Sequence, residues 1–366
     1  MISNTQRIFK GIITVLTLYL TVFLVILPQN CLSAAKEGLS LCLNNVIPSL
    51  FPFFVCSGIL AESGFSVLCS RFLSSFMRPL FRLPGAGAMT FLLGTVSGYP
   101  VGASSAAQLY SSGQCTLAEA QRMTSFCNNS SPIFIIGLVG TGLLGNPSIG
   151  YLLYASHIVS ALITGLIFRF YGKEPSSSMR TLPSSGHGHT KKTALFSFGG
   201  IIDRSVFSTL KVCGFIIFFS VFAQGIPSFG GKPYLCSFIE IAGGTQLLVQ
   251  AAPTHRFFLP VLSFFLGFSG LSVMLQIASI IIPQGLSMKP VAVGKLLQGI
   301  FSFVITLLLT NVFPVTQAAS VTADYSSFPT EISVPDSILS ALLSVFFVVM
   351  LLKGIIFLSS KSKIGG

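Results

Sequence analysis

The chain has 366 residues, of which 52% are hydrophobic and only 8% are charged, with a net charge of +12. A soluble globular protein carries about 25% charged residues, so this composition excludes a water-exposed surface all round and indicates a protein embedded in a lipid bilayer. The Lys and Arg residues form short clusters between apolar runs, which the positive-inside rule explains. Because they form no basic stripe, we expect no nucleic-acid partner.

Hydropathy predicts an all-α polytopic membrane protein with eight transmembrane helices, because a hydrocarbon core of about 30 Å requires about 20 apolar residues. In chain order the predicted spans are 8–28, 46–62, 88–110, 147–170, 205–226, 256–282, 290–313 and 337–360. The first resembles a signal peptide but lacks a nearby small-x-small cleavage site, so we interpret it as an uncleaved span.

Basic residues orient these spans with the N- and C-termini in the cytoplasm. Arg7 precedes the first span, Arg78 follows the second, and Lys289 precedes the seventh; each places its loop on the cytoplasmic side. Loop 314–336 contains no Lys or Arg and three acidic residues, so we expect it outside. Eight spans satisfy all these assignments and predict a multi-pass protein of the cell membrane.

Several segments between the spans also have structural signatures. Residues 31–45 are amphipathic, which predicts an interfacial helix. Thr116 and Glu119 have the spacing of a capping box, which predicts the start of a short helix. Residues 132–145 and 234–251 are apolar but interrupted by glycine, and we predict re-entrant hairpins, whose backbone must be satisfied by protein or a cavity.

The most informative pattern is a weak internal repeat. Residues 91–100 (FLLGTVSGYP) are similar to residues 264–272 (FFLGFSGLS). The charge count makes the first copy run from inside to outside and the second from outside to inside, so the copies are inverted. Inverted repeats with interrupted helices are typical of secondary transporters, whose substrates bind at the breaks near the midplane.

Both copies contain residues that break a helix. Proline lacks the backbone N–H and clashes with the preceding turn, and glycine allows non-helical angles. The predicted breaks are Ser97, Gly98 and Pro100 in the first half, and Ser269 and Gly270 in the second. Alternatively, these residues serve only helix packing, because small residues bring membrane helices together.

Polar residues at membrane depth are the candidate site. Glu240 lies in an apolar stretch, where an ionisable residue indicates function; it binds a cation, a proton or a substrate, or it is an interfacial carboxylate that reaches water. Asn128, Asn129 and Ser130 precede an apolar segment, and they contact a solute or cap the next helix. Gln246, close to Glu240, completes the predicted substrate-binding set.

No chemistry beyond binding is indicated. His157 and Gln276 lie alone in predicted spans, where we expect interhelical hydrogen bonds. Hydrolase and metalloprotease motifs and phosphate loops are absent, so we expect no enzyme. The eight cysteines form no CxxC pair, so we expect no metal site and no cofactor.

Longer stretches carry a family resemblance. Residues 92–103 (LLGTVSGYPVGA) and 119–145 (EAQRMTSFCNNSSPIFIIGLVGTGLLG) resemble the YlbJ-type sporulation integral membrane proteins, which carry a nucleoside recognition, or gate, domain. FIEIAGG (238–244) and FLGFSGLSV (265–273) are similar to that family's second repeat. The resemblance covers roughly 40–310 and implies a role in sporulation, in formation of the spore cortex, with nucleosides among the implied solutes.

These observations divide the chain into five parts. They are a first transmembrane helix (1–30), a first gate-like repeat (31–171), a cytoplasmic linker (172–204), a second gate-like repeat (205–313), and an extracytoplasmic loop with the last transmembrane helix (314–366). The predicted function is transporter-like movement of a small polar solute with a coupling ion, H⁺ or Na⁺. The alternative is a non-transporting assembly or scaffold factor; a homo-oligomer is compatible with either.

Overall fold

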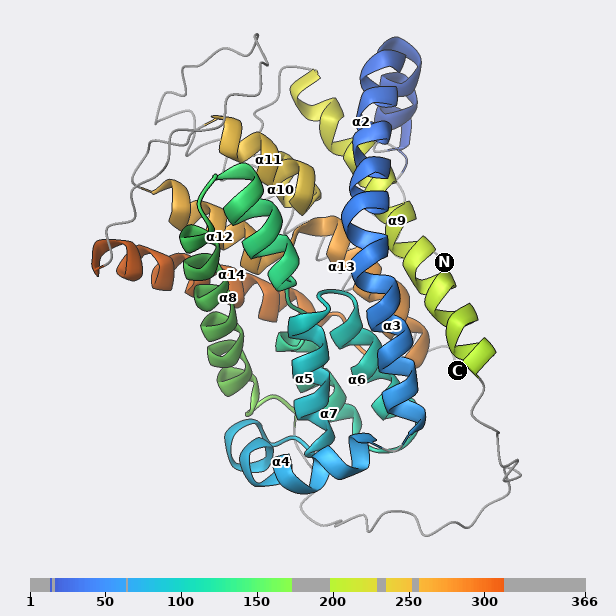
Figure 1. Cartoon of the computed structure of the whole chain (residues 1–366), viewed down its shortest axis with the longest axis vertical. Helices are drawn as coiled ribbons and strands as arrows, with labels where there is room; N and C mark the ends of the chain where they lie inside the picture. The colour runs from blue at the N-terminus through green and yellow to red at the C-terminus, as the bar shows by residue number, and fades with distance from the viewer. Residues whose placement is uncertain are drawn as a thin grey trace, which may run out of the picture.

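The computed structural model describes residues 14, 17–63, 65–172, 198–228, 235–251 and 257–312, which are helical with short connections (Figure 1). Among these residues four helices are long and apolar enough to cross a membrane, or five if a bent pair, Thr17–Ile26 with Pro28–Asn44, is one span. Most of the predicted linker (173–197), loop 314–336 and span 337–360 lie outside the described residues, so the predicted total of eight spans stays a prediction. The predicted end of the linker at residue 204 was wrong, because residues 198–204 are already helical and begin a long helix.

The N-terminal part is one nearly uninterrupted helical run. α2 (Pro28–Leu41), the π-helical η1 (Cys42–Val46) and α3 (Ile47–Glu62) follow one another directly and pack along α9 (Phe198–Ser228) (Figure 1). Residues 31–45 are thus helical and continue directly into α3, and their predicted position at the membrane interface stays a prediction. The wider π turn allows the change in hydrogen bonding that Pro48 requires, because proline donates no backbone N–H.

The predicted span 88–110 is a helical hairpin, which corrects the sequence-based expectation. α4 (Phe65–Phe81) leads into α5 (Ala86–Val96), and the chain reverses before α6 (Val101–Ser111). The side-chain oxygens of Thr90 and Ser105 lie 3.0 Å apart. Fifteen residues of one straight helix would separate them by about 22 Å, so α5 and α6 run antiparallel.

The next helices form an interrupted pair and a long helix. α7 (Leu117–Phe126) begins at the predicted capping box. After residues 127–132 the π-helical η2 (Ile133–Leu143) follows as one helical segment rather than the predicted re-entrant hairpin, and α8 (Pro147–Phe168) then packs against it. Gly140 and Gly150 make this contact close enough for backbone to meet backbone.

The second half has a similar order of elements: a pair of short helices, an interrupted span and a long helix. α10 (Cys236–Ile239) ends at Glu240, where the chain turns sharply into α11 (Ile241–Ala251) and brings Gly244 against the backbone of Ser237. α12 (Phe258–Phe268) and α13 (Gly270–Ile281) form a span interrupted at Ser269, whose φ is +71°. After the 3-10 turn η4 (Ile282–Gln284) comes α14 (Lys289–Val312).

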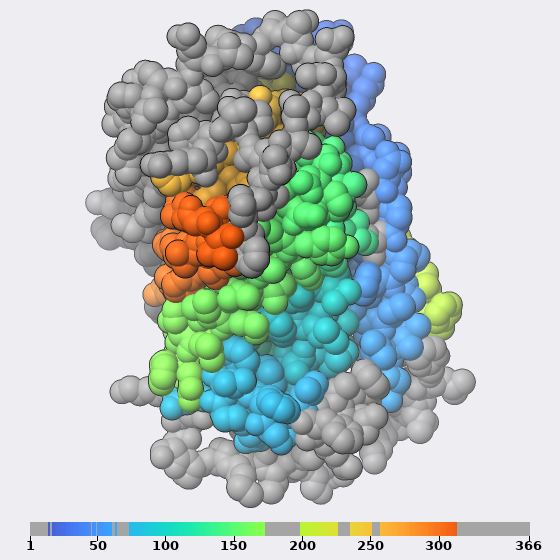
Figure 2. All heavy atoms as spheres, turned by 60° about the vertical axis from the view of Figure 1, so that its left-hand side comes forward, coloured from blue at the N-terminus to red at the C-terminus, as the bar shows by residue number. Residues whose placement is uncertain are grey.

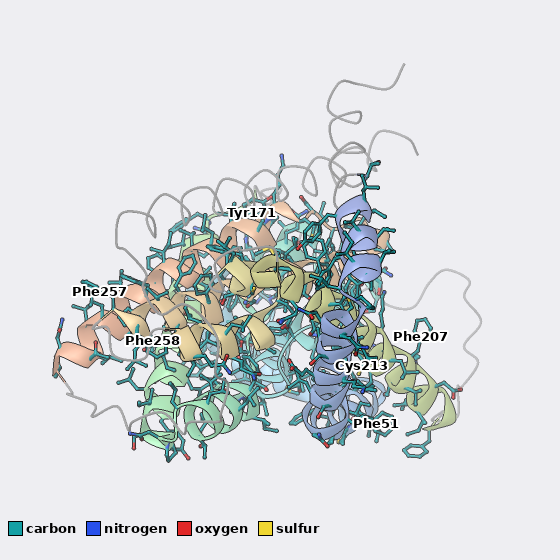
Figure 3. All side chains as sticks on the ribbon, turned by 90° about the horizontal axis from the view of Figure 1, so that it is seen from above. Phe51, Tyr171, Phe207, Cys213, Phe257 and Phe258 are labelled. Atoms are coloured by element: carbon teal, nitrogen blue, oxygen red, sulfur yellow. The ribbon has the colours of Figure 1, made fainter. Side chains whose placement is uncertain are left out.

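The two halves meet where α14 crosses α7, α8 and α12. Gly294 of α14 lies against the Ser125 carbonyl, and Gly267 of α12 lies against the backbone of Gln298. Figure 2 shows the far end of α14 beside α8 on the surface. Many large apolar side chains, mostly aliphatic, are exposed on the described surface, and Phe207 of α9, 72% exposed, points away from the bundle (Figure 3), as expected for a lipid-facing residue.

Candidate functional site

The predicted break of the first half and Glu240 line the same cavity. A cavity of about 90 Å³ lies between the tip of the α5–α6 hairpin, the start of η2, the α10–α11 turn and α13. Its polar lining is Ser97, Gly98, Tyr99, Ser131, Glu240 and Gln276, and the rest of its wall is apolar. α9 and the α2–α3 run complete the wall, and these two pack closely: Cys42 Sγ lies 3.8 Å from the Cys213 carbonyl oxygen.

Glu240 caps α11 and lies between two cavities. Its carboxylate accepts hydrogen bonds from the backbone N–H groups of Ala242 (3.0 Å) and Gly243 (2.6 Å), so the carboxylate occupies the positive end of a helix. A second cavity of about 110 Å³ also contains Glu240, together with Glu37 and Gln246. The carboxyl group therefore borders both cavities while its side chain is only 2% exposed.

Two buried polar atoms at the first cavity have no partner among the described residues. They are the Ser97 hydroxyl oxygen and Gln276 Oε1, on side chains that are 2% and 3% exposed. Buried polar atoms are almost always hydrogen-bonded in folded proteins. A water molecule or a solute with hydrogen-bond donors satisfies both atoms, and the cavity has room for a few waters.

The Asn128–Asn129–Ser130 segment forms the end of α7 rather than a cavity wall. The side-chain amides of Asn128 and Asn129 donate to the carbonyls of Thr124 and Phe126, each at 3.0 Å. They cap the carbonyl end of α7, whose last carbonyls lack helical partners. The capping alternative therefore accounts for these two amides, but on the preceding helix instead of the following one.

Ser130 links the α7 break to the cavity. Its hydroxyl lies 3.2 Å from the hydroxyl of Tyr99, which lines the cavity, and its backbone N–H donates to His157 Nε2 at 3.0 Å. The expected interhelical role of His157 is thus observed. This hydroxyl pair therefore connects the hairpin tip directly to the α7 break.

A lysine lies at the centre of the polar cluster. The ammonium of Lys295, on α14, donates to the backbone carbonyl of Asn128 and to Gln298 Oε1 (2.9 Å). Gln298 in turn donates to Asn129 Oδ1 at 2.8 Å. Lys295 and Gln298 are fully buried, so α14 contributes both a charge and an amide to the end of α7.

The predicted helix breaks exist in both halves, but only the first lines the first cavity. Pro100 begins α6 after a cis Tyr99–Pro100 bond, and Gly98 has φ +88°, so the first predicted break exists. Ser269 and Gly270 interrupt the second span, but Gly270 packs against the carbonyls of Ser237 and Ile239 and does not line the first cavity. Gln246 is exposed and reaches only the second cavity.

Sequence reasoning missed Lys295 and Gln298. Lys295 lies inside the predicted span 290–313, where an ionisable residue is itself a signal of function. Its value as a topology marker concealed this signal, because lysines near span ends are counted as cytoplasmic. Gln276 was expected to make an interhelical hydrogen bond, whereas its Oε1 borders the cavity and has no partner within the described residues.

Several long apolar helices and buried polar groups at helix breaks define a multi-pass membrane protein. Comparisons with known proteins specify its class. The family model described as nucleoside recognition, the gate domain, matches residues 43–232. The sporulation integral membrane protein YlbJ of Bacillus subtilis (strain 168) is 33% identical over an alignment of 342 positions, which covers 84% of this chain and 84% of that protein. The chain therefore belongs to the YlbJ-type family of sporulation integral membrane proteins. No solved structure matches it.

Proposed function

We propose that this chain is a transporter-like protein, not an enzyme, that moves a small polar solute across a membrane during spore cortex formation. One observation carries the proposal: the α5–α6 tip and the α10–α11 turn border one cavity at which buried polar atoms lack partners. Interrupted helices and hairpin tips at such a position typically bind substrate in secondary transporters.

The proposed transporter contains an inverted repeat, but its two copies pair different helices from those that the sequence similarity suggested. A hairpin, an interrupted helix and a long helix occur in this order as α5–α6, α7–η2 and α8, and again as α10–α11, α12–α13 and α14. In the first set the hairpin glycine Gly98 packs on Ser131 beside the α7 break, and in the second the break glycine Gly270 packs on the α10–α11 turn. Residues 91–100 then correspond to the α10–α11 turn rather than to 264–272.

The cavity favours a solute that donates hydrogen bonds. Glu240 and Gln276 offer acceptor oxygens, and Ser97 offers a hydroxyl, against an apolar wall. Amines, amides and hydroxyl-rich solutes, including nucleosides, fit this chemistry. At about 90 Å³ the cavity is smaller than the roughly 300 Å³ of common ligand sites, so a nucleoside-sized solute requires the two hairpins to separate.

Glu240 is the proposed site for a coupling ion, H⁺ or Na⁺. Its carboxylate borders both cavities, so an ion arriving from either one reaches the same group. The alternative function is that of a membrane assembly factor that transports nothing, and the sporulation role of the relative fits both functions. A scaffold has no need of a carboxylate between two cavities, which favours transport.

The test compares two carboxylates that both cap helices. Glu240→Gln keeps the length and one acceptor at the start of α11 but removes the charge, whereas Glu119→Gln does the same at the capping box of α7, away from the cavity. Both variants, matched for membrane level, are assayed for restoring heat-resistant spores to a deletion strain of the host species. We expect Glu240→Gln to restore at least about tenfold fewer spores, because a hydrogen bond to a charged group is worth roughly 1.5–3 kcal/mol.

Equal complementation by the two variants would contradict the proposal and favour the assembly factor. If Glu240→Gln fails while Glu119→Gln succeeds, purified protein in liposomes is assayed for uptake of labelled nucleosides and small amines. Uptake by the wild type that Glu240→Gln reduces supports transport. Normal uptake by Glu240→Gln would assign its sporulation defect to another cause.

A further inference from the structure

We propose that the ammonium of Lys295 occupies a monovalent-cation site formed at the broken end of α7, and so acts as a tethered cation within the protein. This inference does not depend on the proposed transport, because it concerns the end of α7 and not the cavity. It predicts a site for a free monovalent cation in a chain that lacks the lysine side chain.

The oxygen atoms that bind the Lys295 ammonium are of the kind that bind a free cation at the carbonyl end of a helix. Lys295 donates to the Asn128 carbonyl, two residues beyond the last residue of α7, and to Gln298 Oε1 at 2.9 Å. The last carbonyls of a helix lack helical partners and carry the negative end of its dipole. A carbonyl and an amide oxygen are hard, uncharged ligands of the kind that hold hard cations.

No formal negative charge is needed at this position. The two acceptors that the structure gives Lys295 are both neutral, although the side chain is 0% exposed. A buried charge is costly unless it is paired and hydrogen-bonded. The Asn128 carbonyl and the Gln298 amide oxygen therefore supply the compensation that a carboxylate supplies in a salt bridge.

The side-chain oxygen of Asn128, the residue whose carbonyl binds Lys295, has no partner among the described residues. Asn128 Oδ1 belongs to a fully buried side chain and makes no hydrogen bond among the described residues, while the Nδ2 of the same amide is fixed by the Thr124 carbonyl. A cation with room to approach several oxygens at once would satisfy it, whereas the ammonium is restricted by its own side chain. This buried acceptor without a donor is a second observation that points to a missing cation or donor near the end of α7.

The geometry also keeps free ions out of the wild-type site. Gly294 allows α14 to approach until it lies against the Ser125 carbonyl, which places the next residue, Lys295, directly over the end of α7. The lysine then fills the position permanently, because its backbone is part of a packed helix. In the wild type the cation at this site is thus supplied by the sequence and not by the solution.

The experiment removes the tethered cation and offers free ones. Purified full-length wild type and Lys295→Ala are unfolded by heat in ammonium, sodium or choline chloride at equal ionic strength. A thiol-reactive dye follows unfolding, because the chain has eight cysteines and no tryptophan. We expect the midpoint of Lys295→Ala to rise by about 3 °C or more, saturably, in ammonium or sodium but not in choline, with no such difference in wild type.

Two further variants make the result specific. Lys295→Ala/Gln298→Leu removes the amide ligand, and its midpoint should lose the cation response. Lys295→Gln retains a polar side chain without the charge; its midpoint should fall below that of Lys289→Gln, an exposed lysine of the same helix, and should rise in ammonium or sodium. If Lys295→Ala does not accumulate in membranes, the midpoints of Lys295→Gln and Lys289→Gln in the three salts test the cation site instead.

Two results would overturn the proposal. The first is a midpoint of Lys295→Ala that is the same in all three salts, which would make Lys295 a packing residue with a hydrogen bond. The second is a cation response that survives the loss of Gln298 unchanged, which would place the responding site elsewhere. If sodium and ammonium do not stabilise Lys295→Gln either, no cation site exists at the end of α7.

Discussion

Glycines decide how closely the first hairpin approaches α7. A Cβ atom on Gly94 would lie 1.8 Å from the Cys127 carbonyl oxygen, and one on Gly102 would lie 1.9 Å from the same atom. Real carbon atoms do not approach oxygen so closely, so both helices of the hairpin need glycine here. The same contact places the hairpin tip beside the α7 break, which makes these two positions part of the site's architecture.

Alanine at Gly94 is therefore expected to be severely destabilising. Overpacking of this kind costs typically 1–3 kcal/mol and more against rigid backbone, so we expect at least about 3 kcal/mol. The measurement is the amount of folded protein in membranes and its heat-unfolding midpoint. Gly214→Ala in α9, where a Cβ meets nothing within 4 Å, is the control and should be neutral or slightly stabilising.

Single residues were predicted best where the sequence contains an unusual group in an apolar context. Glu240 was found this way and borders the cavity, whereas Lys295 meets the same criterion but resembles an ordinary topology marker. Asn128 and Asn129 were found as a cluster, but their amides cap α7. Sequence reveals that a polar group is buried, but which carbonyl it contacts depends on a chain segment far away.

Elements were harder to predict than residues. Hydropathy cannot distinguish 23 apolar residues that cross a membrane from the same number folded into two antiparallel helices, so 88–110 was assigned as a span. The break itself was visible in Gly98 and Pro100. The sequence does not reveal the angle between the two helices at the break. A small angle would give one kinked span, whereas a reversal of direction gives a hairpin.

The hairpin has a direct chemical test. In Thr90→Cys/Ser105→Cys the two thiols replace hydroxyls that lie 3.0 Å apart, so mild oxidation should form an intramolecular disulfide that peptide mass spectrometry detects. Thr90→Cys/Ser112→Cys moves one thiol about 10 Å along the helix and should not cross-link. A straight span at 88–110 would give no disulfide in either variant.

At the scale of the whole molecule, buried contacts far apart in sequence join the two halves. Lys295 and Gln298 bind the end of α7, and α2 and α3 pack along α9. In each of these contacts one partner lies before the predicted linker and the other lies after it. None of these pairings was visible in the sequence, because they join residues with no shared pattern.

Fragments divided within the linker should therefore reassemble. We expect fragments 1–185 and 186–366, expressed together, to copurify from membranes through a tag on one of them. Lys295→Gln in the second fragment should reduce the amount recovered by several-fold, since it removes a charge-assisted bond between the fragments, and Lys289→Gln should not. Recovery of the tagged fragment alone would show that the covalent connection is required.

The position of Lys295 has a consequence for how the chain is made. Its partner carbonyl belongs to a residue synthesised 167 positions earlier, so α14 leaves the ribosome when the end of α7 is already in the bilayer. A lone ammonium in hydrocarbon is costly, and this order of synthesis provides its acceptors in advance. A chain that ends before α14 therefore leaves the Asn128 carbonyl without its ammonium donor.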